Sequence, residues 1–247
     1  MVRQDVEIEA ADGRCRAVLA VPGGDGAWPG VLVFPDGGGA RETLYAMADR
    51  LASLGYVVLV PDVYYGSGDW APFSMQTVFT EPGERQRLFG LVGTLTNEKI
   101  VRDAGTYLDF LQSRPEVTGS RLGTTGYCMG GRMSLIAAGQ HPDKVVAAAS
   151  FHGGRIAVAD DPQSPHLAAD RMSATVYVAG AEHDDAFTAE QAALLDSALT
   201  AAGVRHTVEF YPARHGFAVP DNPTYDAGAE ERHWKALEEL FGAALAR

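Results

Sequence analysis

Short apolar segments alternate with longer amphipathic ones along most of the chain, and this alternation limits the folds that the chain can adopt. Six short runs contain mainly apolar and small residues, which is typical of parallel strands buried on both faces of a sheet. They cover residues 31–34, 57–60, 122–127, 145–151, 174–179 and 207–211. Four other segments repeat apolar residues at helical spacing. They lie within residues 44–54, 100–111, 192–199 and 234–241. The alternation predicts an α/β fold with a mostly parallel, doubly wound sheet and ligands at the carboxyl ends of its strands.

The first residues follow a different pattern, in which single apolar and polar residues alternate. Residues 6–10 and 15–19 both alternate in this way, and Asp12-Gly13 between them is a tight-turn signal. We therefore expect an antiparallel hairpin at the edge of the sheet, with Cys15 on one strand face. Residues 64–96 are punctuated by glycine and proline and are predicted to form an irregular, cap-like segment over the site. The length of 247 residues is consistent with a single domain over residues 1–247.

The charge and the cysteine content narrow the classes of function. A formal net charge of −12 at pH 7 argues against nucleic acid or an anionic membrane as a partner. The first residues lack the apolar run of a signal peptide, and no segment is long enough to span a bilayer. The two cysteines provide no disulfide framework, so we expect a cytoplasmic protein. A monomer or a small homo-oligomer is expected.

The segment Gly126-Tyr-Cys-Met-Gly-Gly131 has the form of a nucleophile elbow, with a thiol where most such elbows carry serine. A nucleophile on a sharp strand-to-helix turn has a strained backbone, and glycines on either side remove side chains that would collide there. Gly131 lets the following helix pack close to the sheet. The helix that begins at Met129 directs free N–H groups at Cys128 and so favours the thiolate. A buried structural cysteine beside a glycine-rich turn is the alternative.

Two later loops complete a pattern of nucleophile, acid and histidine. Asp184 follows one predicted strand, and His215 follows the next. This is the chain order of α/β-hydrolase triads, in which a carboxylate orients the histidine that moves the proton. Asp184 has the expected spacing to the next apolar residue, and Asp185 is the alternative acid. A metal site at His183, Asp184 and Asp185 is disfavoured because adjacent residues cannot all face one ion.

With these motifs in place, the chain resembles the dienelactone hydrolase family over nearly its full length. The resemblance rests on residues 31–36, residues 55–65, the Cys128 elbow and His215-Gly-Phe217. The cysteine in the elbow is its most specific part. The resemblance implies a hydrolase of small esters or lactones that needs no metal or cofactor. It also implies an acyl-thioester intermediate on Cys128.

The turn Asp36-Gly-Gly-Gly39 after the first central strand is a candidate part of the site. Its glycines let a backbone N–H approach a substrate oxygen, so the amides of Gly37 and Met129 are the candidate oxyanion hole. A flexible glycine turn is the alternative. The family has a glutamate at the position of Asp36, and the resemblance implies that Asp36 activates the thiol. A carboxylate that caps the turn is the simpler interpretation.

The residues expected to contact substrate depart from the family pattern. The resemblance implies an arginine pair that binds the substrate carboxylate, and Arg87 matches its first member. Val219 stands in place of the second arginine and Leu91 in place of a tyrosine. Loss of one arginine removes a contact of about 1.5–3 kcal/mol, which argues against a dienelactone carboxylate as the preferred ligand. Arg41 is a possible replacement, although a solvated surface arginine is the simpler interpretation.

Tyr64 and His152 each follow a predicted strand and are further candidates for substrate contact. The predicted function is hydrolysis of a small ester or lactone through a Cys128 acyl-enzyme. One alternative is a carboxylesterase with broad scope for small esters. Another is a non-catalytic receptor that keeps the α/β-hydrolase fold. A redox-responsive thiol protein is disfavoured because no second cysteine lies near Cys128 in the sequence.

Overall fold

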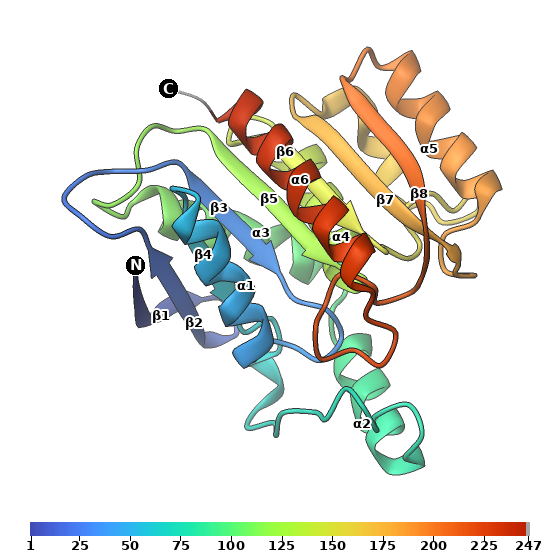
Figure 1. Ribbon diagram of the computed structural model, residues 1–247, viewed down its shortest axis with the longest axis horizontal. Coiled ribbons are helices and arrows are strands. Elements are labelled where there is room, and N and C mark those ends of the chain that lie inside the picture. Colours follow the sequence, from blue (N-terminus) through green and yellow to red (C-terminus); the bar gives the residue numbers. More distant parts are fainter. Residues whose placement is uncertain (246–247) are drawn as a thin grey trace.

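Eight strands form a single sheet in the computed structural model, which describes residues 1–245 (Figure 1). The strands are β1 (Val2–Ala10), β2 (Gly13–Val21), β3 (Gly30–Phe34), β4 (Val57–Pro61), β5 (Leu122–Tyr127), β6 (Val145–Phe151), β7 (Thr175–His183) and β8 (His206–Arg214). Their order across the sheet is β1-β2-β4-β3-β5-β6-β7-β8. From β4 to β8 neighbouring strands are parallel, whereas β1 pairs with β2, and β2 with β4, in antiparallel fashion. The predicted α/β-hydrolase type of sheet with an N-terminal antiparallel hairpin is confirmed.

Helices cover both faces of this sheet. They are α1 (Glu42–Ser53), α2 (Pro82–Gly93), α3 (Asn97–Gln112), α4 (Met129–Gln140), α5 (Ala189–Ala201) and α6 (Ala227–Ala244), with the 3₁₀ turns η1 (Tyr65–Ser67) and η2 (Pro165–Arg171). α1 and α6 lie on the near face in Figure 1, and their apolar residues pack together in one core cluster. The apolar residues of α3, α4 and α5 belong to a second cluster on the opposite face. The two layers leave the carboxyl ends of β3 and β5 to β7 free to carry a site.

All four segments with apolar residues at helical spacing form helices, and three of these helices begin at a side-chain cap, whereas α1 does not. Thr96, Thr188 and Asp226 each accept a hydrogen bond from a backbone N–H in the first turn of α3, α5 and α6, respectively. Such side-chain caps satisfy N–H groups that have no partner within the helix. The apolar stripes of these helices then face the sheet, which explains why their spacing was visible in the sequence.

The N-terminal hairpin places Cys15 in the core, as expected. Its side chain is fully buried, and its thiol lies 3.3 Å from the carbonyl oxygen of Asp62 and 3.7 Å from the Tyr107 hydroxyl. Burial raises the pKa of the Cys15 thiol to about 12, which disfavours the reactive thiolate. Cys15 is therefore a small core residue of the hairpin.

Residues 64–96 differ from the irregular segment that the sequence predicts, because they contain η1 and the 12-residue helix α2. Pro82 lies in the first turn of α2, where a missing N–H costs nothing. Gly83, Gly90 and Gly93 interrupt its pattern, and only Leu88 is buried, so the helix has no continuous apolar stripe to reveal it. α2 lies beyond the carboxyl ends of the central strands (Figure 1). Four buried side chains of this segment form a cluster separate from the two main ones: Phe73, Met75, Val78 and Leu88.

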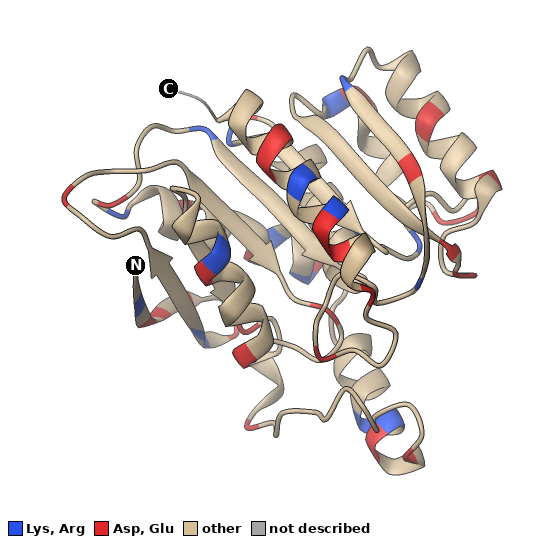
Figure 2. Ribbon diagram, in the orientation of Figure 1, with Lys and Arg blue, Asp and Glu red and all other residues tan. Residues whose placement is uncertain are grey.

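Charged side chains are mixed over the surface. Figure 2 shows Lys and Arg interspersed with Asp and Glu on α1, α2 and α6, so the excess of negative charge forms no single patch there. Within residues 1–245, no helix combines the length and the apolar character needed to cross a bilayer.

Candidate active site

Cys128 stands at the junction of β5 and α4 with a backbone conformation of φ 55° and ψ −120°. A positive φ is unfavourable for a residue with a Cβ and persists only where its surroundings impose it. A Cβ on Gly126 would lie 1.9 Å from the Gly130 carbonyl oxygen, and one on Gly130 would lie 2.3 Å from that of Phe34. The spacing of glycines around Cys128 is therefore a steric requirement of the turn, as the sequence indicates.

Gly131 has the packing role predicted for it. A Cβ at this position would lie 2.4 Å from the Ser150 hydroxyl oxygen on β6. The first turn of α4 thus approaches the sheet more closely than any residue with a side chain would allow. This approach fixes where the free N–H groups at the start of α4 lie relative to Cys128.

His152 holds the backbone of the elbow from the neighbouring strand. The backbone N–H of Cys128 donates to two acceptors, each at 3.1 Å: the Phe151 carbonyl oxygen and the Nδ1 atom of His152. The His152 ring is fully buried, and its backbone φ is also positive, at 41°. Its Nε2 atom has no hydrogen-bond partner among the residues that the structure describes. Burial, then the nearby His215 and His233, keep the pKa of His152 well below its usual value, so the ring is neutral and can accept at Nδ1.

His215 lies between Asp184 and the Cys128 thiol. Its Nδ1 atom is 2.6 Å from Asp184 Oδ2, and the other oxygen of Asp184 accepts the backbone N–H of Ala186 at 2.9 Å. Burial opposes a charge on the His215 ring, but Cys128 and the Asp184 carboxylate outweigh it and raise the pKa of His215 to about 10. The structure thus brings together the three side chains that the sequence orders as nucleophile, acid and base.

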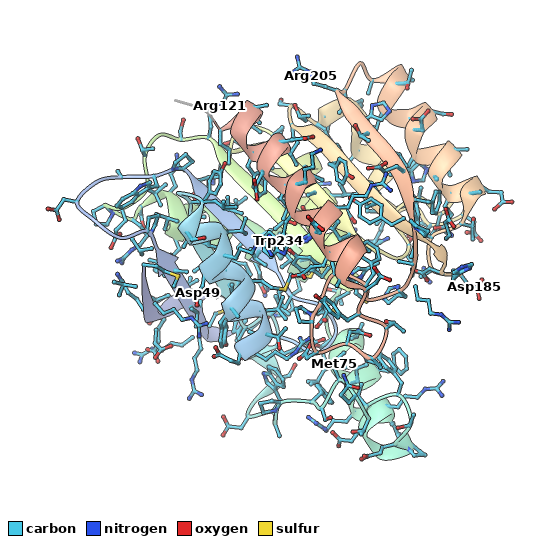
Figure 3. The ribbon with its side chains drawn as sticks, in the orientation of Figure 1. Asp49, Met75, Arg121, Asp185, Arg205 and Trp234 are labelled. Carbon is cyan, nitrogen blue, oxygen red and sulfur yellow. The ribbon has the colours of Figure 1, made fainter. Side chains whose placement is uncertain are left out.

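Asp184, and not its neighbour Asp185, faces the histidine. The Asp184 side chain is only 6 % exposed. Burial would raise the pKa of its carboxyl group, but the hydrogen bonds from His215 and Ala186 lower it overall. Asp185 is exposed and points away from the body of the protein in Figure 3. No group of three or more His, Cys, Asp or Glu side chains in residues 1–245 is arranged to hold a metal ion.

The turn after β3 lies against the start of α4. The Tyr64 hydroxyl donates to the Gly37 carbonyl oxygen at 2.9 Å and lies 3.5 Å from the Met129 sulfur. This contact fixes the glycine turn beside the first residue of α4, and both Gly37 and Met129 line the cavity that contains Cys128. The two backbone amides proposed as oxyanion donors are therefore neighbours of the thiol.

Asp36 and Arg41 form a buried ion pair within the same turn. Arg41 donates to Asp36 Oδ1 at 2.6 Å and Oδ2 at 3.0 Å, and to the two oxygens of Asp221 at 2.7 Å each. Arg41 is only 8 % exposed, so it is not the solvated surface arginine that the sequence suggested. Its guanidinium joins the glycine turn to the loop that follows His215. Because the Arg41 guanidinium already donates to both carboxylates, it has little capacity left to bind a substrate anion.

Two cavities meet at the Cys128 thiol. The first, which we call the cap limb, has a volume of about 310 Å³. It extends beneath α2 and has mostly apolar walls: Met75, Phe79, Leu88, Phe89 and Val92. Figure 3 shows Met75 on this side of the molecule, next to α2. Its carboxylates, Asp36 and Asp184, are both engaged with partners.

The second cavity, which we call the basic limb, has a volume of about 690 Å³. It shares Cys128, Met129 and His215 with the cap limb but extends toward α3 and the loop after β6. Phe89, Val92 and Ala186 also line both limbs. The other walls of the basic limb combine apolar residues (Leu95, Ile100 and Met133) with polar ones (Asn97, Arg132, Arg155, Asp161 and Gln163). The thiol thus lies where an apolar cavity joins one whose walls also carry charged side chains, so a substrate with two different ends can place a carbonyl at the junction.

Two residues expected to contact substrate do not line either limb. Tyr64 is fully buried beneath the glycine turn, so its role is to support Gly37. Arg87 bonds to both oxygens of Glu84 and to the Ala71 carbonyl, and its guanidinium stacks 3.7 Å from the Phe73 ring centroid. The sequence predicts that Tyr64 and Arg87 both lie in an irregular loop that opens to the cavity. In the structure η1 begins directly after Tyr64 and Arg87 belongs to α2, and each side chain donates to a backbone carbonyl oxygen.

Comparison with known proteins settles the family. The sequence model of the dienelactone hydrolase family matches residues 15–245. The chain belongs to the dienelactone hydrolase family. As a member of that family it is a carboxylic ester hydrolase.

Several proteins with similar sequences or structures match the chain over most of its length. A Methylorubrum extorquens protein named as a carboxymethylenebutenolidase is 27 % identical over 98 % of this chain and 81 % of its own. A dienelactone hydrolase-like promiscuous phosphotriesterase from metagenomic libraries is 28 % identical, with a TM-score of 0.77 over 99 % of both chains. A Klebsiella pneumoniae protein described as a dienelactone hydrolase has a TM-score of 0.81 and 22 % identity over 98 % of both chains, which bears on the fold alone.

This member of the dienelactone hydrolase family lacks the arginine pair that the resemblance implies. Val219 is fully buried in the core cluster beneath α1 and α6. Arg87 is directed onto Glu84, and Arg41 is held by two carboxylates. Neither the pairing of Arg41 with Asp221 nor the position of Arg155 beside the cavity can be recognised from the sequence, because nothing local to these residues distinguishes them from surface arginines.

Proposed function

We propose that this chain hydrolyses a small ester or lactone through an acyl-thioester on Cys128. The observation that carries the proposal is the chain of contacts from Asp184 through His215 to the thiol, at the junction of two cavities. This arrangement provides a nucleophile, a base and an orienting acid. The chain acts as a single domain in which residues 64–96 serve as a cap over the site.

The reaction proceeds in two halves. The Cys128 thiolate attacks the carbonyl carbon while the amides of Gly37 and Met129 donate to the oxyanion. When the C–O bond breaks, the His215 imidazolium gives its proton to the leaving oxygen. A water molecule then attacks the thioester, His215 takes its proton, and the thiolate is released. Because thiolate is also a good leaving group, activated esters and enol lactones are favoured over amides.

Asp36 has a different part in this scheme from the one that the resemblance implies. Both of its oxygens accept hydrogen bonds from Arg41, and one also accepts from the Gly38 N–H at 2.9 Å. Direct activation of the thiol would require the carboxylate to leave these partners. We therefore assign Asp36 the positioning of the turn that carries Gly37.

The experiment that tests the proposal compares wild type with Cys128→Ala and Cys128→Ser on activated aryl esters and enol lactones. Wild type is expected to turn over at least one of them, with an acyl-enzyme detectable by mass spectrometry of the quenched reaction. Cys15→Ser is the matched control for loss of a thiol and should retain turnover. A Cys128→Ala protein that is folded and as active as wild type would refute the mechanism.

A carboxylesterase with broad scope for small esters is a second candidate. The apolar walls of the cap limb, which include Phe79 and Phe89, favour this candidate because an apolar surface can pack against many acyl or aryl groups without specific hydrogen bonds. Equal kcat/KM across a series of unrelated short acyl and aryl esters would support broad scope. A neutral aryl phosphotriester belongs in that series, because a related structure is described as a promiscuous phosphotriesterase.

A further inference from the structure

The basic limb carries an excess of positive charge in an acidic protein. Its walls contain Arg132, Arg155 and Asp161, so two guanidinium groups face one carboxylate. The whole chain has a formal net charge of −12 at pH 7. A local positive charge beside a nucleophile is therefore contrary to the general field of the protein, and a concave site concentrates its effect on a ligand.

Arg132 supplies charge to this limb but has little freedom to bind a ligand. Its side chain is 15 % exposed and donates to the carbonyl oxygens of Arg155 and Gln163, to Asn97 and, at 3.4 Å, to Asp161. Burial, together with the nearby Arg155, lowers the pKa of Arg132 despite Asp161. The surroundings of Arg132 therefore do not fully compensate its positive charge, and an anion bound nearby would stabilise it.

Arg155 combines a fixed backbone with a free side chain. Its φ is 55°, a strained value for a residue other than glycine. The strain is held from both sides, because its N–H donates to the Ala186 carbonyl at 3.2 Å and its own carbonyl accepts from Arg132. Its side chain is 73 % exposed, and its ion pair with Asp161 is long, at 3.6 Å. Arg155 can therefore turn toward a ligand without any movement of the main chain.

We propose that the basic limb binds an anionic group, a carboxylate or a phosphate, on a substrate whose scissile carbonyl lies at Cys128, and that Arg155 pairs with that group. The inference rests on the proposed function and names its substrate class: an ester or lactone with an apolar part for the cap limb and an anionic end. A guanidinium suits both anions because it donates two parallel hydrogen bonds. The arginine proposed to bind the anion thus lies on the loop after β6, and not at the positions of Arg87 and Val219.

The first test uses pairs of esters that differ only in charge. Para-nitrophenyl hemisuccinate and its methyl ester place the charge on the acyl side. The acetyl ester of para-hydroxybenzoate and its methyl ester place it on the leaving group, and para-acetoxyphenyl phosphate replaces carboxylate by phosphate. For wild type we expect a higher kcat/KM for the anionic member of at least one pair. In Arg155→Gln the anionic-to-neutral ratio should fall by about tenfold, which is the effect of a lost charge-assisted hydrogen bond.

Matched variants separate charge from folding. Arg155→Lys should retain most of the ratio, whereas Arg155→Glu should lower it further and favour a cationic ester. Arg121→Gln makes the same charge change just before β5, at the opposite end of that strand from Cys128, and it should leave the ratio unchanged (Figure 3). An unchanged ratio in both Arg155→Gln and Arg155→Glu, with normal folding, would overturn the assignment while leaving the hydrolase proposal intact.

A second test does not depend on hydrolysis. In a Cys15→Ser background, the Cys128 thiol is reacted with two disulfides, the dicarboxylate dithiobis(nitrobenzoate) and the neutral dithiodipyridine. The ratio of the two rates should fall about tenfold in Arg155→Gln and further in Arg155→Glu. If no ester is turned over but this ratio falls, the anion site stands and the hydrolase proposal fails. If the ratio does not change in either variant, the anion site is refuted.

Discussion

The Nδ1 atom of His152 accepts a hydrogen bond from the backbone N–H of Cys128 at 3.1 Å. Both residues have a positive φ, so two strained positions that directly follow the adjacent strands β5 and β6 support one another. The His152 ring also lies edge-on to His215, with ring centroids 5.2 Å apart. A single neutral imidazole thereby holds the backbone of the proposed nucleophile and packs against the proposed base.

Replacement of His152 should therefore affect chemistry more than substrate binding. In His152→Leu the acceptor is lost and a branched side chain is forced into a positive φ, so we expect kcat to fall about tenfold or more with a smaller change in KM. His152→Asn keeps an acceptor and tolerates positive φ, so it should retain most of the activity. The rate of Cys128 alkylation by iodoacetamide, measured against pH, separates this role from simple loss of folding. Equal kcat in the Leu and wild-type proteins would contradict the positioning role.

Replacement of the acid should distinguish the two neighbouring aspartates. Asp184→Asn removes the carboxylate that orients His215, so kcat should fall by roughly 10³–10⁴, as in comparable triads. Asp185→Asn, an identical change at the adjacent exposed position, should leave kcat within about twofold of wild type. Steady-state hydrolysis of one activated ester by both variants is sufficient. Similar losses in the two variants would contradict the assignment of Asp184.

The contribution of His215 to stability should depend on pH. Because the pKa of folded His215 is raised to about 10 from 6.5, the folded state favours the imidazolium. The stabilisation is complete below the unfolded pKa and is lost as the pH rises through about 10. The difference in unfolding free energy between wild type and His215→Gln should thus shrink from about pH 6 to above pH 10, as measured by urea denaturation. A constant difference over that range would show that the raised pKa has no such effect.

Loss of Arg41 should destabilise the fold because it leaves two carboxylates unpaired. In Arg41→Gln the buried Asp36 loses both guanidinium contacts, and we expect a loss of about 3–5 kcal/mol in unfolding free energy. Arg3→Gln breaks an exposed pair with Asp49 and Glu42 and should cost less than about 1 kcal/mol. Asp36→Asn should alter stability more than the rate of Cys128 alkylation. A large loss of thiol reactivity at unchanged stability would instead support direct thiol activation by Asp36.

The steric reading of the elbow is tested by two glycine substitutions. Gly130→Ala places a Cβ 2.3 Å from the Phe34 carbonyl oxygen, so the elbow and β3 must separate, and turnover should be lost with a marked fall in Tm. In Gly90→Ala, on α2, the new Cβ has no neighbouring atom within 4 Å, and the helix should gain about 0.5–1 kcal/mol. Thermal unfolding and ester hydrolysis of both variants provide the comparison. Normal turnover in Gly130→Ala would show that the elbow is not tightly packed.

Much of the fold could be predicted from the sequence, because burial on both faces leaves apolar runs in the strands of this sheet. The helices with one buried face were equally visible. α2 was not, since it has three glycines and buries only Leu88. Its position is set by contacts with its own small cluster, which have no periodic pattern in the chain.

The site could be predicted where the chemistry is local and not where it depends on distant partners. The elbow around Cys128 and the order of Asp184 and His215 are both local signals. The pairing of Arg41 with Asp221 joins residues 180 positions apart, so the sequence alone gave no reason to bury that arginine. For the same reason the prediction that Arg87 contacts substrate was not supported, because Glu84 and Phe73 hold its guanidinium.

The ion pairs of Arg41 also have a consequence for how the enzyme can diverge. One guanidinium fastens the loop of the proposed oxyanion donor to the loop of the proposed base, so a mutation in either loop disturbs both. We therefore expect a substitution at position 36, 41 or 221 to be tolerated only when a second substitution at one of the other two positions compensates for it. Arg155 has no part in these ion pairs, so new substrate preferences should evolve first at this position while the proposed reactive centre stays the same.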